Sequence, residues 1–212
     1  MNYHPTDTFM QSIFPVLPVP KLGEFQELNR EGHRYLAADD GLWLEVRTPW
    51  LYFRQKIGDS FGVPIPYGKI SSEIRFTCPP IPKHLLADFV QASREASPNE
   101  IAAQIIWNRL TNAFRLQVLG FTSNGPAHID YLTPEYDEGE MMVVDLHSHG
   151  RFGADFSRKD DIDDIGAIKI AAVVGRCDTE KPEVLMRLCV LGLYCRLPSP
   201  LAEETMERCY GT

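Results

Sequence analysis

The chain has 212 residues, of which 44% are hydrophobic and 24% are charged, close to the averages for a globular protein. This composition excludes collagen, a coiled coil and a largely disordered chain, and the length allows a buried core without metal or disulfide staples. With 21 Lys and Arg against 29 Asp and Glu, the net charge is −8, and the sequence shows no basic stripe. Because an acidic surface repels phosphate backbones, we expect no nucleic-acid partner.

We expect a cytoplasmic protein with no membrane partner. No stretch approaches the roughly 18 consecutive apolar residues that a membrane-spanning helix needs. Residues 1–20 contain several prolines and no Lys or Arg, which is unlike a secretory signal. The 5 cysteines are an odd number without C-x-x-C spacing, which indicates reduced, structural thiols.

The first domain that we predict, residues 1–68, consists of an N-terminal arm and a small β-rich unit. Prolines in the first twenty residues predict an extended arm without a regular helix. Asp39-Asp40-Gly41 lies between two apolar segments and is typical of a hairpin turn, since Asp and Gly tolerate positive φ. The strands expected in this unit lie at residues 35–38, 42–46 and 51–53.

The second predicted domain, residues 69–212, has the pattern of one compact α/β unit. Apolar residues at positions 85, 86, 89 and 90 have helical spacing, and they predict a helix over residues 81–96. Residues 141–146 are nearly all apolar, as in a strand buried on both faces. The other expected elements are strands at 101–107, 114–122 and 128–133, a helix at 157–169, and strands at 170–174 and 184–193.

The most informative stretch is Asp145-Leu146-His147-Ser148-His149-Gly150, which Ser157 and Asp160 follow. The two histidines are two residues apart at the end of a strand, so their side chains share one face and can share a metal ion. Asp160 is a candidate third ligand. Two histidines and one carboxylate leave tetrahedral Zn²⁺ one position for water, which is the arrangement of a catalytic zinc site.

The same residues also permit simpler interpretations. Ser157 and Asp160 have the spacing of a capping box, which satisfies the first amides of a helix without a metal. A single histidine is most simply a partly buried residue whose hydrogen bonds are satisfied within the protein. A pair of histidines after a buried strand weakens this interpretation. Asp161, Asp163 and Asp164 are most simply favourable charges at a helix N-terminus.

Three other classes of hydrolase fit less well. Amidohydrolase-type barrels need about 250 residues and histidines downstream of the motif, whereas every histidine here lies at or before position 149. Zinc nucleoside deaminases need H-x-E and P-C-x-x-C, and neither occurs in this chain. A cysteine hydrolase is disfavoured because Cys177, Cys189 and Cys195 fall in or beside apolar strands, where thiols are usually inert.

The spacing of His147, His149, Ser157 and Asp160, H-x-H-x7-S-x2-D, resembles the JAMM motif of the JAB/MPN metalloprotease family. The resemblance covers about residues 82–197 and includes the order of helices and strands; the layout also weakly resembles the PRTRC system protein A subgroup. It implies an α/β (mixed α+β) fold in which helices flank a cytidine-deaminase-like sheet. The β-rich unit would then be an N-terminal extension of a JAB/MPN-like metalloprotease domain.

The resemblance also implies roles for individual residues. It implies that His147, His149 and Asp160 bind Zn²⁺ and that the hydroxyl of Ser157 lies beside the reacting carbonyl. It further implies a catalytic glutamate on the strand after the first helix, and Glu100 fits that place.

Glu95 is a weaker candidate for the glutamate because the helical pattern includes it. An ordinary strand-edge carboxylate is the alternative interpretation of Glu100.

Two residues depart from the family pattern. Gly150 replaces a usual Pro, which we expect to loosen the following loop. Asp145 replaces a usual aromatic residue; it either orients an imidazole or points into the cleft and alters substrate choice.

The function implied by the resemblance is hydrolysis by a zinc-dependent peptidase or isopeptidase. Its substrate would be an amide or isopeptide bond at the C-terminal tail of a ubiquitin-like protein, with an activating-enzyme-like protein as a partner. One alternative is a non-catalytic MPN-type scaffold that binds proteins; such members have generally lost a His or Asp ligand, whereas all are present here. The other is a metal-dependent hydrolase of a different small substrate.

Overall fold

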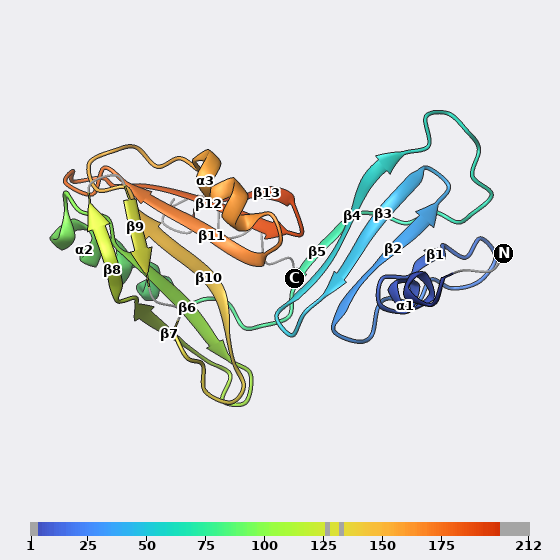
Figure 1. The fold of residues 1–212 in the computed structure, drawn as a ribbon, viewed down its shortest axis with the longest axis horizontal. Coiled ribbons are helices and arrows are strands. Elements are labelled where there is room, and N and C mark those ends of the chain that lie inside the picture. Colours follow the sequence, from blue (N-terminus) through green and yellow to red (C-terminus); the bar gives the residue numbers. More distant parts are fainter. Residues whose placement is uncertain (1–3, 126–127, 132–133, 200–212) are drawn as a thin grey trace. The chain divides into compact units, whose positions relative to one another are not determined.

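The structure is a computed structural model that describes residues 4–125, 128–131 and 134–199. The chain divides into two compact units, Met1–Pro79 and Pro80–Thr212 (Figure 1). This division lies beyond the predicted boundary at residue 68, because strand β5 (Glu73–Phe76) pairs with the N-terminal sheet. Within the described ranges, no helix combines the length and the apolar character needed to cross a membrane.

The N-terminal unit is β-rich, as predicted, and is built on one sheet with the strand order β1-β2-β3-β4-β5. Strand β1 pairs with β2 in parallel, and the later neighbours pair antiparallel. Leu36, Ala38 and Trp43 pack with Val19 in its core. The first four strands are β1 (Val16–Pro18), β2 (Gly32–Ala38), β3 (Gly41–Arg47) and β4 (Leu51–Asp59).

The predicted hairpin is confirmed, since β2 and β3 pair around Asp39 and Asp40. The prediction of an arm without a regular helix was wrong: α1 spans Pro5–Ile13. A proline in the first turn is tolerated because its missing N–H would have no helical partner there. The ring of His4 caps this turn by accepting a hydrogen bond from the Thr6 N–H at 3.2 Å.

The C-terminal unit has the predicted mixed α/β fold, which is consistent with a JAB-like fold. Its main sheet has the strand order β13-β12-β11-β10-β6-β7, and β8 and β9 form a separate pair (Figure 1). Strands β10 and β11 pair in parallel, and their other neighbours pair antiparallel. The elements are α2 (Lys83–Ala96), β6 (Ala102–Asn108), β7 (Ala113–Val118), β8 (Phe121–Gly125), β9 (His128–Tyr131), β10 (Glu140–Ser148), α3 (Arg158–Asp164), β11 (Ile168–Gly175), β12 (Glu183–Val190) and β13 (Leu193–Leu197).

Two predicted elements of this unit differ from the structure. The helix predicted over 157–169 ends at Asp164, and Lys169 belongs to β11, because pairing with β12 begins at Ile168. The strand predicted over 114–122 is divided between β7 and β8. Residues 132–133 of the strand predicted over 128–133, and Cys209, lie outside the described residues.

Candidate metal centre

Strand β10 carries two candidate ligand residues at or just after its C-terminal end. Along the strand Leu146 and Ser148 are buried, whereas Asp145, His147 and His149 are partly exposed. This alternation follows from the two-residue period of an extended chain. It confirms that both histidine side chains lie on one face of the sheet.

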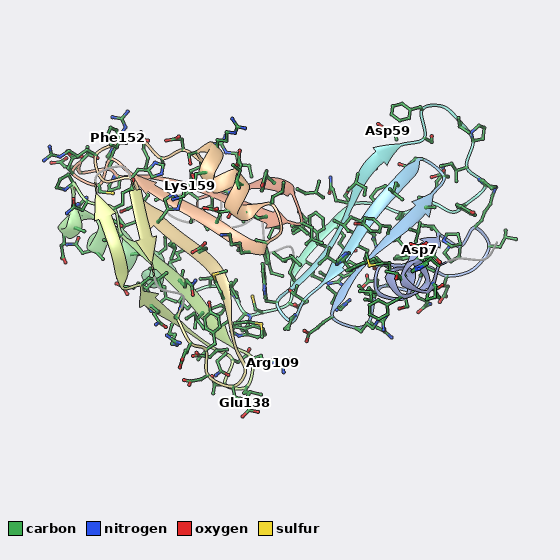
Figure 2. All side chains as sticks on the ribbon, viewed as in Figure 1. Asp7, Asp59, Arg109, Glu138, Phe152 and Lys159 are labelled. Carbon is green, nitrogen blue, oxygen red and sulfur yellow. The ribbon has the colours of Figure 1, made fainter. Side chains whose placement is uncertain are left out.

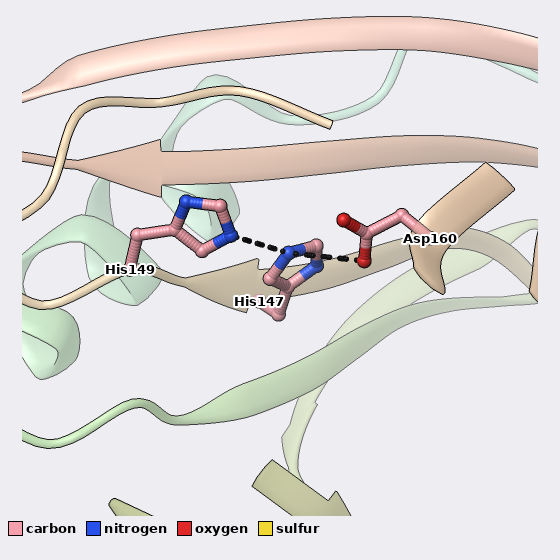
Figure 3. A group of neighbouring side chains, drawn as sticks. All are labelled: His147, His149 and Asp160. Atoms are coloured by element: carbon pink, nitrogen blue, oxygen red, sulfur yellow. Dashed lines mark hydrogen bonds and ion pairs between the residues drawn. The ribbon is translucent and has the colours of Figure 1, made fainter. Parts of the chain in front are cut away.

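The side chains of His147, His149 and Asp160 lie together, with one donor atom of each within 4.8 Å of the others, and His147 lies between the other two (Figure 3). The two Nε2 atoms are 3.1 Å apart, and Oδ1 of Asp160 lies 3.5 Å from Nε2 of His147. In tetrahedral zinc with bonds of about 2.0–2.1 Å, neighbouring ligand atoms are about 3.3–3.4 Å apart. Two of the three donor separations are close to this value and the third is within 4.8 Å, so the three residues fit zinc with a small shift of their side chains.

The hydrogen bonding of His149 and the burial of His147 both favour binding of a cation through Nε2. Nδ1 of His149 lies 3.1 Å from the carbonyl oxygen of Gly153, so the Nδ1–H donates there and the Nε2 lone pair faces His147. Burial lowers the pKa of His147, although the charge of Asp160 opposes this effect. The lower pKa favours the neutral imidazole, which is the form that binds metals.

The capping box at α3 is present and does not compete with metal binding. Oδ2 of Asp160 accepts hydrogen bonds from the N–H and the hydroxyl of Ser157, each at 2.6 Å. The N–H of Asp160 donates to the Ser157 hydroxyl at 3.3 Å. Because Oδ1 is the oxygen that faces His147, one carboxylate closes the helix with one oxygen and offers the other to the metal.

A cavity of about 410 Å³ adjoins this cluster. Glu100 lines it and is only 7% exposed, whereas Glu95 lies on α2 and accepts a hydrogen bond from Gln91 at 2.8 Å. Of the two predicted glutamates, Glu100 is thus the one in the site. The cavity is lined by Glu100, Asp145, His147, His149, Phe152, Asp155, Phe156, Ser157, Lys159, Asp160, Asp163, Asp164, Lys169 and Ala171; Phe152 and Lys159 are labelled in Figure 2.

Ser148, between the two histidines, fixes the segment that follows Glu100. Its N–H donates to the carbonyl of Ile101 at 2.9 Å, and its hydroxyl accepts from the Ile101 N–H at 3.0 Å. The hydroxyl is fully buried, so these bonds are shielded from water. Sequence reasoning did not assign Ser148 this function.

Gly150 does not loosen the loop after the histidines, contrary to our expectation. Its φ is +52°, and a Cβ there would come within 2.2 Å of the carbonyl oxygen of Pro98. Its own carbonyl accepts from the Cys177 N–H at 2.7 Å, and the His149 N–H donates to Val174 at 2.8 Å. Glycine is therefore required by the tight packing of this turn.

Asp145 lines the cavity, and its carboxylate accepts a hydrogen bond from Nζ of Lys169 at 2.5 Å. The same ammonium lies 2.7 Å from Asp164, which also binds Arg187 at 2.7 Å. Asp164 is only 3% exposed, so its predicted role as a charge at the helix N-terminus was wrong. Burial alone lowers the pKa of Lys169, but the two carboxylates raise it above its usual value, so the ammonium stays charged.

Sequence reasoning missed Lys169 and Arg187 as parts of the site. The available signal was a basic residue inside the apolar part of each of two strands, β11 and β12. A buried charge is costly unless it has a partner, so such residues indicate a buried ion pair.

The four described cysteines carry free thiols. Burial raises the pKa of Cys78 to about 11 and that of Cys189 to about 12, and it also raises the pKa of Cys177 and Cys195. A raised pKa disfavours the reactive thiolate. These residues therefore do not support a cysteine-based hydrolase.

Comparison with protein-family models gives two matches. Residues 4–77 match a domain of unknown function, DUF2016, and residues 82–189, half of the chain, match the model of prokaryotic homologs of the JAB domain. The chain belongs to the family of prokaryotic homologs of the JAB domain. The JAB-domain match includes the three candidate metal ligands, His147, His149 and Asp160. Neither match addresses the PRTRC subgroup.

No curated protein matches the chain. Among solved structures, the solution structure of protein DSY2949 from Desulfitobacterium hafniense is similar to it, with 18% sequence identity and a TM-score of 0.42. The matched region covers 54% of this chain and 86% of that protein.

Proposed function

We propose that this chain is a zinc-dependent peptidase or isopeptidase of the JAMM type. The observation that carries the proposal is the convergence of His147 Nε2, His149 Nε2 and Asp160 Oδ1 beside the carboxylate of Glu100 in one cavity. Membership of the JAB-domain family supports this class, and equally an MPN-type scaffold. A complete ligand set next to a buried carboxylate favours the hydrolase.

Zinc bound by His147, His149 and Asp160 would lower the pKa of a water molecule and polarise the substrate carbonyl. Glu100 takes the proton of the attacking water as general base and passes it to the leaving amine as general acid. Its burial and its place in the cavity suit this function. The hydroxyl of Ser157, which donates to Oδ2 of Asp160 at 2.6 Å in this structure, turns from that oxygen to donate a hydrogen bond to the oxyanion that develops on the substrate.

The substrate that we propose is an amide or isopeptide bond at the C-terminal tail of a ubiquitin-like protein. This part of the proposal rests on the family resemblance, as does an activating-enzyme-like partner. A flexible tail suits a site that lies in a cavity of limited volume beside α3. A cytoplasmic location and the absence of a nucleic-acid partner stay predictions from the sequence.

The test is hydrolysis of a fluorogenic amide on the C-terminal tail of a ubiquitin-like protein, together with zinc analysis of the purified chain. We expect about one zinc per chain, loss of hydrolysis after treatment with a chelator, and recovery on adding zinc. A thiol-alkylating reagent should leave the rate unchanged. Hydrolysis that persists without metal would contradict the proposal, and zinc binding without hydrolysis of any tail would favour the scaffold.

A further inference from the structure

Lys169 connects the two elements that supply the metal ligands. Its ammonium lies 2.5 Å from Oδ2 of Asp145, which is two residues before His147 on β10. It also lies 2.7 Å from Oδ1 of Asp164, at the end of α3, the helix that carries Asp160. All three charged side chains are largely shielded from water, with exposed fractions of 11% for Lys169, 14% for Asp145 and 4% for Asp164. Buried ion pairs are screened less than surface pairs, so this bridge fixes the two elements relative to each other.

Arg187 on β12 holds α3 from another side. Its guanidinium binds Asp161 at 2.5 Å and Asp164 at 2.7 Å. The same group lies over the rings of Phe156 and Tyr194, at 3.9 and 4.2 Å from their centroids. A planar cation that pairs with two carboxylates and contacts two aromatic rings has little freedom to move. The helix is therefore fastened to the sheet at both of these aspartates.

These contacts act on Asp160 through the helix. The capping box fixes the carboxylate of Asp160 relative to Ser157, but it lies within α3 and does not fix the helix on the sheet. One further hydrogen bond joins the sheet to this seven-residue helix: the hydroxyl of Tyr194 donates to the carbonyl of Asp161 at 2.7 Å. The separation between Asp160 Oδ1 and His147 Nε2 thus depends on what fastens α3 to β10, β11 and β12.

We propose that Lys169 and Arg187 are positioning residues of the metal centre, which hold the helix of Asp160 against the strand of His147. This inference rests on the proposed function, since it assumes that the cluster binds zinc. Neither side chain is a ligand. Their effect is on the affinity and the geometry of the bound ion.

The sign of the effect separates positioning from simple electrostatics. Lys169 is a cation close to the site of a second cation, so if it acted only through its charge, replacing it by Met would tighten metal binding. If it positions the ligands, the same substitution weakens binding. Residues that orient metal ligands typically change metal affinity by about 10–100-fold when mutated.

The experiment compares zinc affinity, measured by competition with a chromophoric chelator, in the wild-type chain and in Lys169→Met and Arg187→Met. We expect affinity to fall by about 10–100-fold in each variant. The visible absorption of bound Co²⁺ should change as well, because it reports the geometry of the ligands. Arg196→Met is the matched control: Arg196 faces Arg187 across β12 and β13 and is exposed, and its replacement should change neither readout.

A second variant covers the case in which Lys169→Met leaves buried carboxylates unpaired and fails to fold. Lys169→Met/Asp145→Asn keeps the local charge balanced, so electrostatics alone predicts little change, whereas loss of the bridge predicts weaker binding and an altered Co²⁺ spectrum. Unchanged or tighter zinc binding in the folded variants overturns the inference while leaving the proposed function intact. Failure of the wild-type chain to bind zinc would instead refute the proposed function, and this inference with it.

Discussion

Each unit of the molecule contains a cluster of polar side chains with a buried or partly buried carboxylate. The two clusters differ in their balance of hydrogen-bond donors and acceptors. In the N-terminal unit Glu45 is fully buried. One of its oxygens accepts from the Leu28 N–H at 2.9 Å and the Tyr52 hydroxyl at 2.8 Å, and the other accepts from the guanidinium of Arg34. Donors surround this acceptor, so the cluster is complete without a ligand.

In the C-terminal unit the atoms that converge are mainly acceptors. Two imidazole nitrogens and one carboxylate oxygen face one another at 3.1 and 3.5 Å, and the Nδ1–H of His149 is directed away, toward Gly153. Acceptors at such distances repel unless a proton or a cation lies between them. A buried charge whose hydrogen bonds are all made therefore stabilises a fold, whereas acceptor atoms that face one another indicate a binding site for a cation.

The largest effect that we expect is the loss of zinc from variants of the convergent cluster. His147→Ala, His149→Ala and Asp160→Ala each remove one of three ligands, so zinc per chain should fall from about one to near zero, and hydrolysis should be abolished. Elemental analysis and the tail-hydrolysis assay measure the two quantities. The control is His84→Ala, which removes an exposed histidine from α2. Zinc retained in all three variants would contradict the conclusion that this cluster binds the metal.

Glu100→Gln separates the chemistry from the binding of metal. It keeps the size of the side chain and removes the base, so we expect zinc content to be unchanged and kcat to fall by about 10²–10⁴-fold. Glu95→Gln on α2 is the matched control and should keep full activity. A fully active Glu100→Gln enzyme would remove Glu100 from the mechanism.

Glu45→Ala should have the converse effect in the other unit. Removing one partner of a buried ion pair leaves Arg34 without its carboxylate, so the free energy of unfolding of this unit should fall by about 3–5 kcal/mol. Urea denaturation measures the loss, and zinc per chain should not change. Glu24→Ala, at an exposed position of the same unit, should change the free energy of unfolding by less than about 0.5 kcal/mol. If Glu45→Ala reduced zinc content in folded protein, the two clusters would not be independent.

Ser157→Ala should have the smallest of these effects. Loss of one oxyanion donor typically lowers kcat by about 10²–10³-fold. Because Ser157 also caps α3, its removal should cost about 1 kcal/mol of stability, which a thermal melt detects. Ser157→Thr keeps both the hydroxyl and the cap and should retain most of the activity. Equal kcat in Ser157→Ala and the wild-type chain would limit Ser157 to its structural function.

The parts of the site that sequence reasoning predicted depend on short-range geometry. The shared face of His147 and His149 follows from the period of a strand, and the bond pattern of Ser157 and Asp160 follows from the spacing of a capping box. The hairpin at Asp39 and Asp40 is local in the same sense. Such features are visible in a sequence because a few neighbouring residues determine them.

The parts that were wrong or missed depend on contacts between distant segments. The ion pairs of Lys169 with Asp145 and Asp164 join three segments of the chain, and their register is set by the pairing of β10 with β11. The hydrogen bonds of Ser148 with Ile101, which were missed, likewise depend on how β6 pairs with β10. Helix α1 was missed for another reason: prolines were counted over a segment without regard to position, and one at the start of a helix is favourable.

Whether His147, His149 and Asp160 bind zinc is best tested by a crystal structure of the zinc-loaded protein, with anomalous diffraction measured at the zinc absorption edge. We expect one strong anomalous peak about 2.0–2.2 Å from Nε2 of His147, Nε2 of His149 and Oδ1 of Asp160, with a water molecule as fourth ligand. A peak elsewhere, or one at the histidines with the carboxylate of Asp160 turned away, would contradict it.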